Sequence, residues 1–329
     1  MGAVDKMKIL FAGTPEIAVP SLEALIASPG TDVVAVLTNP DRPVGRGRRI
    51  EASPVKQKAL EAGLRVYQPE KPDEDFYDVV RFLRPDLLVV FAYGQIFPED
   101  FLLLFPKGGI NIHPSLLPRW RGPSPIQAAV LNRDRETGFT IQTMVKKMDA
   151  GDILYRETVL LSGKETTETL TELFAGLCAA AVVPVVENID RYLENRIPQD
   201  VNGVTYCRKV GREDGCIDWS RPAVEIEALI RAFYPWPKAY TFLNDIELYF
   251  LSAAVYDRSR LPFSLVEPAE RVSPGTVFGY SKQDGFLIKT GDGILSASVL
   301  QLKARKALDA ASFKNGSPDF VGTCLGSKE

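Results

Sequence analysis

The sequence predicts an α/β protein with two domains, an N-terminal doubly wound domain followed by a smaller C-terminal β-barrel. Three observations lead to this prediction. The 329 residues exceed what a typical single core contains. Residues 1–155 alternate short strand-like and helical patterns, which is typical of a parallel sheet covered by helices. Residues 240–302 form short alternating segments separated by Gly, Asp and Pro, which is typical of a small barrel.

Local patterns predict the N-terminal elements in order. Strands are expected at 8–12, 32–38, 64–67, 86–92, 109–113, 140–145 and 153–159, and helices at 16–27, 53–62, 73–83, 125–131 and 166–189. Ser53 is expected to cap the second helix. The run 86–92 is apolar on both faces, as a central parallel strand is. Pro184 is expected to bend the last helix.

The periodicity fades over residues 192–212, which are polar and contain Pro and Gly. Such a stretch is typical of a linker. The expected division is therefore an N-terminal catalytic domain over 1–191, a linker over 192–212 and a C-terminal β-barrel domain over 213–329. A helix near 224–233 is expected early in the last domain.

The composition excludes several classes of protein. No uncharged apolar run approaches the roughly 20 residues that span a bilayer, so no membrane span is predicted. The N-terminus lacks the apolar core of a signal peptide, which predicts a cytoplasmic protein. Four cysteines without Cys-x-x-Cys spacing and one histidine leave no plausible zinc set, so no metal is expected. The net charge of −3 argues against a globally basic coat for nucleic acid.

His113 is the only histidine in the chain, so any imidazole chemistry must use it. It follows Asn111 by two residues in the strand-like run 109–113, and residues i and i+2 of a strand point to the same face. The amide and the imidazole therefore converge, and such a pair can stabilise a developing oxyanion. A lone histidine is more often a packed or surface residue. Here the strand ends at Pro114 and opens into a loop at the edge where α/β sheets bind ligands, which favours a functional role.

The turn Lys147–Asp152 lies between two predicted strands and holds two carboxylates beside a glycine. By itself it is also compatible with an ordinary turn. With Asn111 and His113, a carboxylate would complete a coherent set: a donor, an acid/base or electrostatic group, and a group that orients the ring and favours its protonated form. The residues alone leave the choice between Asp149 and Asp152 open.

The loop 39–49 places four arginines among two glycines and two prolines, namely Arg42, Arg46, Arg48 and Arg49. Arginine forks suit phosphate groups, and a mobile loop can close on a nucleic-acid backbone. A solvated basic loop is the alternative interpretation. The Gly-x-Gly in this loop does not open a helix after a strand, so it is not a dinucleotide fingerprint, and the chain has no Walker A motif.

Over nearly its whole length from Lys8, the sequence closely resembles the methionyl-tRNA formyltransferases. The motifs that carry the resemblance are Phe11-Ala-Gly-Thr-Pro15, Pro40-Asp-Arg-Pro-Val-Gly-Arg-Gly47, Ala92-Tyr-Gly94, Asn111-Ile-His-Pro-Ser-Leu-Leu-Pro-Arg-Trp-Arg-Gly122, Met148-Asp-Ala-Gly-Asp152, Ile217-Asp-Trp-Ser220 and Arg231-Ala-Phe-Tyr-Pro-Trp-Pro237. The Asn-x-His and Asp-x-Gly elements are shared by folate-dependent formyltransferases of this fold, whereas the arginine loop and the last motif are particular to the tRNA enzymes. The resemblance implies a Rossmann-like formyltransferase domain and an OB-like barrel.

The resemblance also implies a reaction. The donor would be 10-formyltetrahydrofolate, as a co-substrate, and the acceptor the α-amine of methionine on initiator tRNA. Asn111 and protonated His113 would stabilise the tetrahedral oxyanion. Asp149 would hold the histidine and help to move protons through water. Loss of one oxyanion donor should cost about 10²-fold or more in turnover.

Contact residues follow from the same resemblance. The residues expected to contact folate are Val89, Phe91, Tyr93, Gly94, Ser115, Leu116, Leu117, Pro118 and Asp152. The residues expected to clamp the acceptor stem are Arg42, Arg46, Arg48 and Arg49, while the C-terminal domain holds the tRNA arm. Binding of tRNA should then weaken steeply with salt. The protein is expected to be a monomer.

Two rival functions remain open at this stage. The trio alone also fits formyltransferases that act on a glycinamide ribonucleotide or an amino-sugar nucleotide, or that hydrolyse the folate donor. The arginine loop and the C-terminal domain favour tRNA, because a small acceptor would not need them. A non-catalytic tRNA-binding protein is the rival from another class, and the intact Asn111, His113 and Asp149 argue against it.

Overall fold

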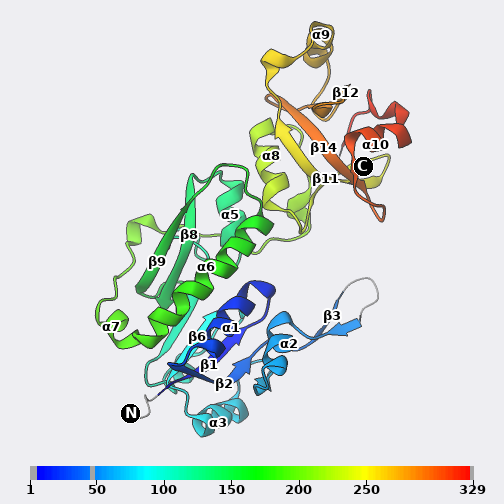
Figure 1. Cartoon of the computed structure of the whole chain (residues 1–329). Coiled ribbons are helices and arrows are strands. Elements are labelled where there is room, and N and C mark those ends of the chain that lie inside the picture. The colour runs from blue at the N-terminus through cyan, green and yellow to red at the C-terminus, as the bar shows by residue number, and fades with distance from the viewer. Residues whose placement is uncertain (1–5, 45–48, 327–329) are drawn as a thin grey trace. The chain divides into compact units, whose positions relative to one another are not determined.

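The computed structural model describes residues 6–44 and 49–326. Its backbone divides into two compact units. The first unit contains residues up to Pro125, Glu136–Leu160 and Leu170–Arg208, and the second contains Ile126–Arg135, Leu161–Thr169 and the residues from Lys209 on. Each unit has its own sheet (Figure 1).

A seven-stranded sheet forms the frame of the first unit. Its order is β5-β2-β1-β6-β7-β8-β9, with parallel pairing as far as β7 and antiparallel pairing beyond it. The strands are β1 (Met7–Gly13), β2 (Thr31–Leu37), β5 (Val66–Tyr67), β6 (Leu87–Phe91), β7 (Gly109–His113), β8 (Glu136–Thr143) and β9 (Ile153–Leu160). The strand order reverses between β1 and β6, which confirms the predicted doubly wound class. Ligands bind such sheets at the carboxyl ends of the strands beside this reversal.

Helices of the first unit connect these strands. They are α1 (Val19–Ala27), α2 (Pro54–Glu61), α3 (Glu74–Leu83), α4 (Glu99–Leu102), α6 (Thr167–Glu187) and α7 (Ile189–Glu194), with the first residues of α6 counted in the second unit. Ser53 Oγ accepts a hydrogen bond from Lys56 N at 3.1 Å, so the predicted cap of α2 is confirmed. A short hairpin of β3 (Arg42–Val44) and β4 (Arg49–Glu51) precedes α2.

Among the described residues, α6 is the one helix that is long and apolar enough to cross a membrane by length and composition, with a mean hydropathy of 1.9. The side chains of Phe174, Cys178, Val182 and Val185 are fully buried. They recur every three or four residues and so lie on one face of the helix. This burial pattern is that of a helix packed against a protein core.

The segment predicted as a linker, residues 192–212, is structured for most of its length and belongs to the first unit up to Arg208. Arg121 N donates to Thr205 O at 2.9 Å, and Cys207 N donates to Arg121 O at 2.8 Å. The segment also contains the end of α7 and a 3-10 turn at Val201–Gly203, and single bridges join Ile197 to Ile153 of β9 and Tyr206 to Arg121 in the loop after β7. Such a pairing leaves no periodic pattern in the sequence, which is why the sequence predicted a linker.

The second unit is built on a six-stranded antiparallel sheet. Its order is β10-β11-β14-β13-β12, and β15 also pairs with β14. The strands are β10 (Ala239–Leu243), β11 (Ile246–Val255), β12 (Val277–Ser281), β13 (Gly285–Lys289), β14 (Ile294–Leu302) and β15 (Leu308–Asp309). Val277 N donates to Thr323 O at 2.9 Å, and Phe242 N donates to Gly326 O at 3.0 Å. The C-terminal residues therefore link the first and last strands of the path, which is compatible with the predicted small barrel.

Among the residues that the structure describes, four helices belong wholly or mainly to the second unit. They are α5 (Pro125–Leu131), α8 (Ala223–Ala232), α9 (Phe263–Arg271) and α10 (Ala310–Gly316). In the core of this unit the Trp219 ring packs edge-on against Phe250, and Trp219 Nε1 donates to Thr241 Oγ1 at 3.1 Å. The indole thus fills the core while its polar nitrogen is satisfied.

Glu247 on β11 contacts two cationic side chains in the second unit. Its carboxylate accepts hydrogen bonds from Lys303 Nζ at 2.7 Å, Arg212 Nη2 at 2.5 Å and Tyr249 Oη at 2.5 Å. Burial alone would raise the pKa of Glu247. The hydrogen bonds from Lys303 and Tyr249 and the charges of Arg212 and Lys303 outweigh burial, so the pKa lies below its ordinary value.

Candidate active site

The end of β7 and the turn after β8 bring the predicted trio together. Asn111 and His113 lie two residues apart on β7, and the antiparallel register places Gln142 of β8 beside Asn111. The turn between β8 and β9 then returns Asp149 to the same place. Its Oδ1 lies 3.4 Å from Asn111 Nδ2 and 3.6 Å from His113 Nδ1.

The Asp149 carboxylate is surrounded by nitrogen donors. Gly122 N donates to Oδ2 at 2.8 Å, and Gln142 Nε2 donates to Oδ1 at 3.2 Å. The Asp149 side chain is 10% exposed, so these bonds replace the water that burial removes. Gly122 has a φ of 121°, and a Cβ there would overlap the Cys207 backbone. Only glycine therefore lets this N–H reach the carboxylate.

His113 lies between two acceptors. Nε2 is 2.9 Å from Trp120 O, Nδ1 faces the Asp149 carboxylate, and the imidazole is 6% exposed. A carbonyl and a carboxylate only accept hydrogen bonds. A ring with an N–H on both nitrogens can donate to both neighbours, whereas a neutral ring can donate to one. Both ring nitrogens therefore face an acceptor.

A cavity of about 380 Å³ opens beside these groups and includes all three members of the trio in its wall. This volume lies within the range of small-molecule sites. The contacts from Asn111 and His113 to Asp149 are longer than ordinary hydrogen bonds, so both donors are available to an oxygen bound in the cavity. Among residues 6–44 and 49–326, no group of three or more His, Cys, Asp or Glu side chains is arranged to hold a metal ion.

The cavity includes some of the residues predicted to contact folate. Tyr93 and Gly94 line it. Val89 and Phe91 are fully buried, and the β6 neighbours Val90 and Ala92 line the cavity in their place. Because side chains alternate along a strand, Val89 and Phe91 point to the face of β6 opposite Val90.

The other residues predicted to contact folate are absent from the lining of this cavity. Ser115, Leu116, Leu117 and Pro118 do not line the cavity. Thr140 Oγ1 donates to Ser115 O at 2.7 Å and accepts from Leu117 N at 3.1 Å, which fastens the loop after His113 to β8. Asp152 accepts from Arg196 Nε at 3.0 Å, and its own N–H donates to Thr143 Oγ1 at 2.9 Å. It therefore anchors the turn that carries Asp149.

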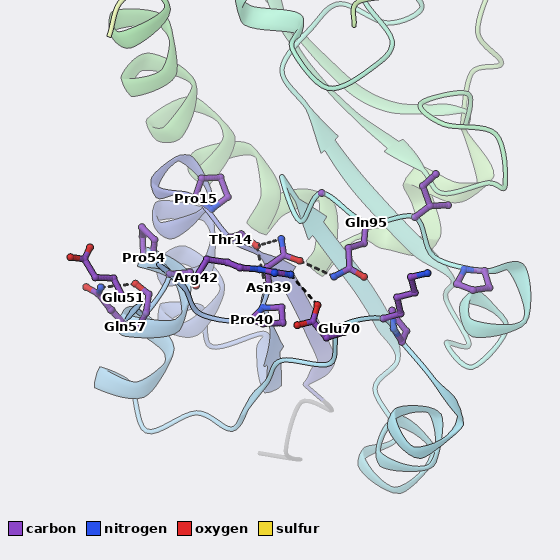
Figure 2. A pocket seen from close by; sticks show the side chains of 17 residues that line it. Thr14, Pro15, Asn39, Pro40, Arg42, Glu51, Pro54, Gln57, Glu70 and Gln95 are labelled. Atoms are coloured by element: carbon purple, nitrogen blue, oxygen red, sulfur yellow. Dashed lines mark hydrogen bonds and ion pairs between the residues drawn. The ribbon is translucent and has the colours of Figure 1, made fainter. Parts of the chain in front are cut away.

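A larger cavity of about 1180 Å³ lies where the chain leaves β1 and β6, at the reversal of strand order. It shares Gly94, Gln95 and Ile96 with the smaller cavity. Asn39 Nδ2 donates to Thr14 Oγ1 at 3.0 Å, and Gln95 Nε2 donates to Asn39 Oδ1 at 2.8 Å (Figure 2). The edge predicted to bind ligands thus carries two adjoining cavities.

Of the four predicted tRNA contacts, Arg42 is the one whose side chain is described. It lines the larger cavity, and its Nη2 pairs with Glu70 Oε2 at 2.9 Å, with both side chains exposed (Figure 2). Arg46 and Arg48 lie outside the described residues, as does the Arg49 side chain. The exposed Arg42 pair is screened by solvent and is easily exchanged for another anion.

Asp41, the residue before Arg42, accepts hydrogen bonds from two side chains. Lys56 Nζ donates to the Asp41 carboxylate at 2.5 Å, and Gln68 Nε2 donates to it at 2.8 Å. These hydrogen bonds lower the pKa of Asp41, with Lys56 as the larger cause. The start of the loop 39–49 is therefore hydrogen-bonded to α2 through Lys56 and to the residue after β5 through Gln68.

Two groups near the smaller cavity have pKa values raised by burial. Burial raises the pKa of Tyr93 to about 12, so the phenol is neutral at physiological pH. Its ring stacks on Phe97 with centroids 5.2 Å apart, and its Oη has no hydrogen-bond partner among the described residues. Burial also raises the pKa of the Cys207 thiol, which is therefore protonated and unreactive at neutral pH.

Sequence reasoning missed three residues that hold Asp149. Gly122 and Gln142 bond its carboxylate, and Gln199 Nε2 donates to its backbone oxygen at 3.0 Å. Gln142 sits inside a predicted strand, and only its register opposite Asn111 gives it this contact. Gln199 sits in the predicted linker. No local pattern marks either glutamine, because both contacts depend on long-range pairing.

Sequence comparisons agree with this architecture. The profile "Formyl transferase" matches residues 6–186, and "Formyl transferase, C-terminal domain" matches residues 209–318. Fold and site thus define a formyl transferase. The methionyl-tRNA formyltransferase of Treponema denticola is 43% identical over 96% of this chain and 98% of its own length. The chain belongs to the methionyl-tRNA formyltransferase family.

Solved structures share the fold at lower identity. Methionyl-tRNA formyltransferase from Clostridium thermocellum is 17% identical with a TM-score of 0.52, over 76% of this chain and 94% of that one. HypX from Aquifex aeolicus, in complex with tetrahydrofolic acid, is 16% identical with a TM-score of 0.60 over 96% of this chain. This chain spans about half of HypX, namely 48%. These likenesses concern the fold alone.

Proposed function

We propose that this chain transfers the formyl group of 10-formyltetrahydrofolate to the α-amine of methionyl initiator tRNA, for translation initiation. The observation that carries the proposal is the convergence of Asn111, His113 and Asp149 on one cavity in a member of the methionyl-tRNA formyltransferase family. In the reaction the amine nitrogen bonds to the formyl carbon and the bond from that carbon to the folate nitrogen breaks. One proton passes from the amine to the folate nitrogen.

The trio supplies three complementary functions. Asn111 Nδ2 and protonated His113 donate hydrogen bonds to the formyl oxygen as it gains negative charge. Asp149, with its Oδ1 3.6 Å from His113 Nδ1, stabilises the imidazolium and passes the amine proton through water. Removal of either oxyanion donor should cost about 10²-fold in turnover.

The folate donor fits the 380 Å³ cavity and supplies the formyl carbon there. The chain leaves the β6 ladder after Phe91, and Ala92 and Gly94 adopt φ values of 52° and 84°. Backbone amides beyond the ladder are available to a flat heterocycle, with Tyr93 and Gly94 in the wall. The proposed folate-binding set also includes Val89, Phe91, Ser115–Pro118 and Asp152, which in this structure do not line the cavity.

The acceptor binds through both halves of the chain. The arginine loop, through Arg42, Arg46, Arg48 and Arg49, clamps the acceptor stem by its phosphates, and the C-terminal domain over 213–329 holds the tRNA arm. Catalysis then belongs to the domain over 1–191, with 192–212 between them. A set of arginine–phosphate contacts makes binding fall steeply with salt.

The proposal also covers the cellular location and the oligomeric state of the enzyme. We assign the enzyme to the cytoplasm, with no membrane partner and no bound metal. We assign the monomer as the working form. Light scattering at working concentration tests that assignment, because a dimer would double the mass.

The test of the function is transfer of labelled formyl from 10-formyltetrahydrofolate to Met-charged initiator tRNA. Met-charged elongator tRNA and free methionine serve as competing acceptors in parallel reactions. Product on the initiator alone is expected, and His113→Ala should abolish most of it. Consumption of the donor without any formylated acceptor would instead indicate a hydrolase or a small-molecule formyltransferase.

A further inference from the structure

Gln199 reaches the active site from the irregular segment that follows α7. Its Nε2 donates to Gly151 O at 2.7 Å, to Asp149 O at 3.0 Å and to Gln142 Oε1 at 3.2 Å. These three acceptors belong to β8 and to the turn that carries the catalytic carboxylate. One half-buried amide thus ties the turn to the strand that precedes it.

Arg121 fixes the orientation of the Gln199 amide by bonding to its oxygen. The Arg121 side chain donates to Gln199 Oε1 from Nε at 3.1 Å and from Nη2 at 2.7 Å, and the residue is 5% exposed. A guanidinium has donors and no acceptor. The oxygen of Gln199 must therefore face Arg121, and its NH₂ group must face the turn.

The Gln142 amide is likewise held in one orientation, with its nitrogen toward the Asp149 carboxylate. Its Oε1 accepts from Gly151 N at 3.1 Å and from Gln199 Nε2, so its own Nε2 is the atom that faces Asp149 Oδ1 at 3.2 Å. Reversal of the Gln142 amide would place an oxygen against the carboxylate. The hydrogen bonds from Arg121 to Gln199 and from Gln199 to Gln142 therefore orient the Gln142 amide so that Asp149 Oδ1 faces a donor.

The turn needs such support. Asp149 has a φ of 51°, which is unfavourable for a residue with a side chain and persists only where the surroundings impose it. The Gln199 amide donates to the backbone oxygens of Asp149 and Gly151, the two residues that flank Ala150. A change of φ at Asp149 would break these bonds and turn the carboxylate away from His113.

We propose that Gln199 is a positioning residue for formyl transfer, which sets the orientation of the Asp149 carboxylate through the turn backbone and through Gln142. It acts without touching substrate. The proposal rests on the function assigned above to Asp149. It concerns the contact between Asp149 and His113, and this contact can be observed without the acceptor.

The test compares three variants. Gln199→Glu keeps an oxygen for Arg121 but turns the second oxygen toward three acceptors, so the tie to the turn is lost. Gln199→Met keeps the side-chain length and removes both polar groups. Asn195→Asp is the matched control, because it makes the same amide-to-carboxylate change on the same segment, where the exposed Asn195 amide donates to Arg191 O of its own helix.

Two measurements separate positioning from a general structural role. We expect kcat to fall about 10- to 100-fold in both Gln199 variants, because small displacements of a catalytic group have effects of this size. The KM values for folate and tRNA should stay within about twofold of wild type. His113 is the only histidine, so ¹⁵N-histidine labelling gives NMR signals from this one imidazole. Those signals should shift in Gln199→Glu and not in Asn195→Asp.

Each contrary outcome overturns the proposal. Wild-type kcat in Gln199→Met would do so even if Gln199→Glu fails to fold. A rise in both KM values with unchanged imidazole signals would show a role in binding or folding instead. If wild type formylates no tRNA, the function proposed above fails, while unshifted imidazole signals in the Gln199 variants would sink the positioning role independently.

Discussion

Asp149→Asn tests the central contact of the site with a change of one atom. The Asp149 oxygens accept from Gly122 N at 2.8 Å and from Gln142 Nε2 at 3.2 Å, and Oδ1 also faces His113 Nδ1. An asparagine has one acceptor and one donor group. If its oxygen keeps the Gly122 bond, its NH₂ group faces Gln142 Nε2 and Asn111 Nδ2, which are themselves donors.

The magnitude follows from the interaction between the Asp149 carboxylate and His113. At 3.6 Å this contact is longer than a hydrogen bond in the free protein, and it is expected to tighten into a charge-assisted one during the reaction. Hydrogen bonds to charged groups contribute about 1.5–3 kcal/mol. At 1.36 kcal/mol for each factor of ten, this loss lowers kcat by about 10- to 150-fold. The contact of the buried NH₂ group with these two donors should also cost about 1–3 kcal/mol of stability.

Single-turnover formyl transfer, with each substrate saturating, measures this change without a contribution from binding. Asp190→Asn is the matched control, because Asp190 pairs with Lys107 at 2.6 Å on the surface. Such an exposed pair contributes little. The reasoning fails if Asp149→Asn keeps kcat within about threefold of wild type, or if the control loses as much.

Three further predictions address the turn, the arginine loop and the second unit. Gly151→Ala should lower both kcat and stability, the latter by about 1–3 kcal/mol on chemical denaturation, because a Cβ would overlap Thr143 O. Gly176→Ala in α6, where a Cβ meets nothing, should be neutral or stabilising, and equal losses in both variants would contradict the steric argument. Arg42→Ala should raise the tRNA KM about tenfold and leave the folate KM unchanged, and parallel rises would refute the clamp. The pKa of Glu247 lies below its ordinary value of 4.5, so this carboxylate stabilises the fold above that pH and the stabilisation is lost as the pH falls through the folded-state pKa. Glu247→Gln should thus be less stable than wild type at pH 7, and unfolding curves at decreasing pH should converge; a constant gap would exclude this linkage.

Local patterns predicted those parts of the fold that depend on neighbours in sequence. The apolar run of β6 identified a central strand, and Ser53 identified the start of α2. Asn111 and His113 were predicted to share a face because a strand has a period of two. The same period places Val89 and Phe91 on the face opposite Val90, and nothing local says which face of β6 meets the cavity.

Contacts between distant segments were beyond such patterns. The turn after β8 holds two aspartates, and the residues alone did not choose between them. The choice of Asp149 needs the register that places Gln142 opposite Asn111, and the loop after β7 that brings Gly122 N to the carboxylate. The family resemblance supplied Asp149, but neither pattern nor resemblance pointed to Gln199.

The donors around Asp149 explain why the distant segment matters. The carboxylate accepts from neutral groups, Gly122 N and Gln142 Nε2, while the buried cation of Arg121 is separated from it by the Gln199 amide. A guanidinium in direct contact would compete with His113 for the negative charge. Arg121 therefore sets the direction of the amides without neutralising the carboxylate, and the charge of Asp149 remains available to the only imidazole in the chain.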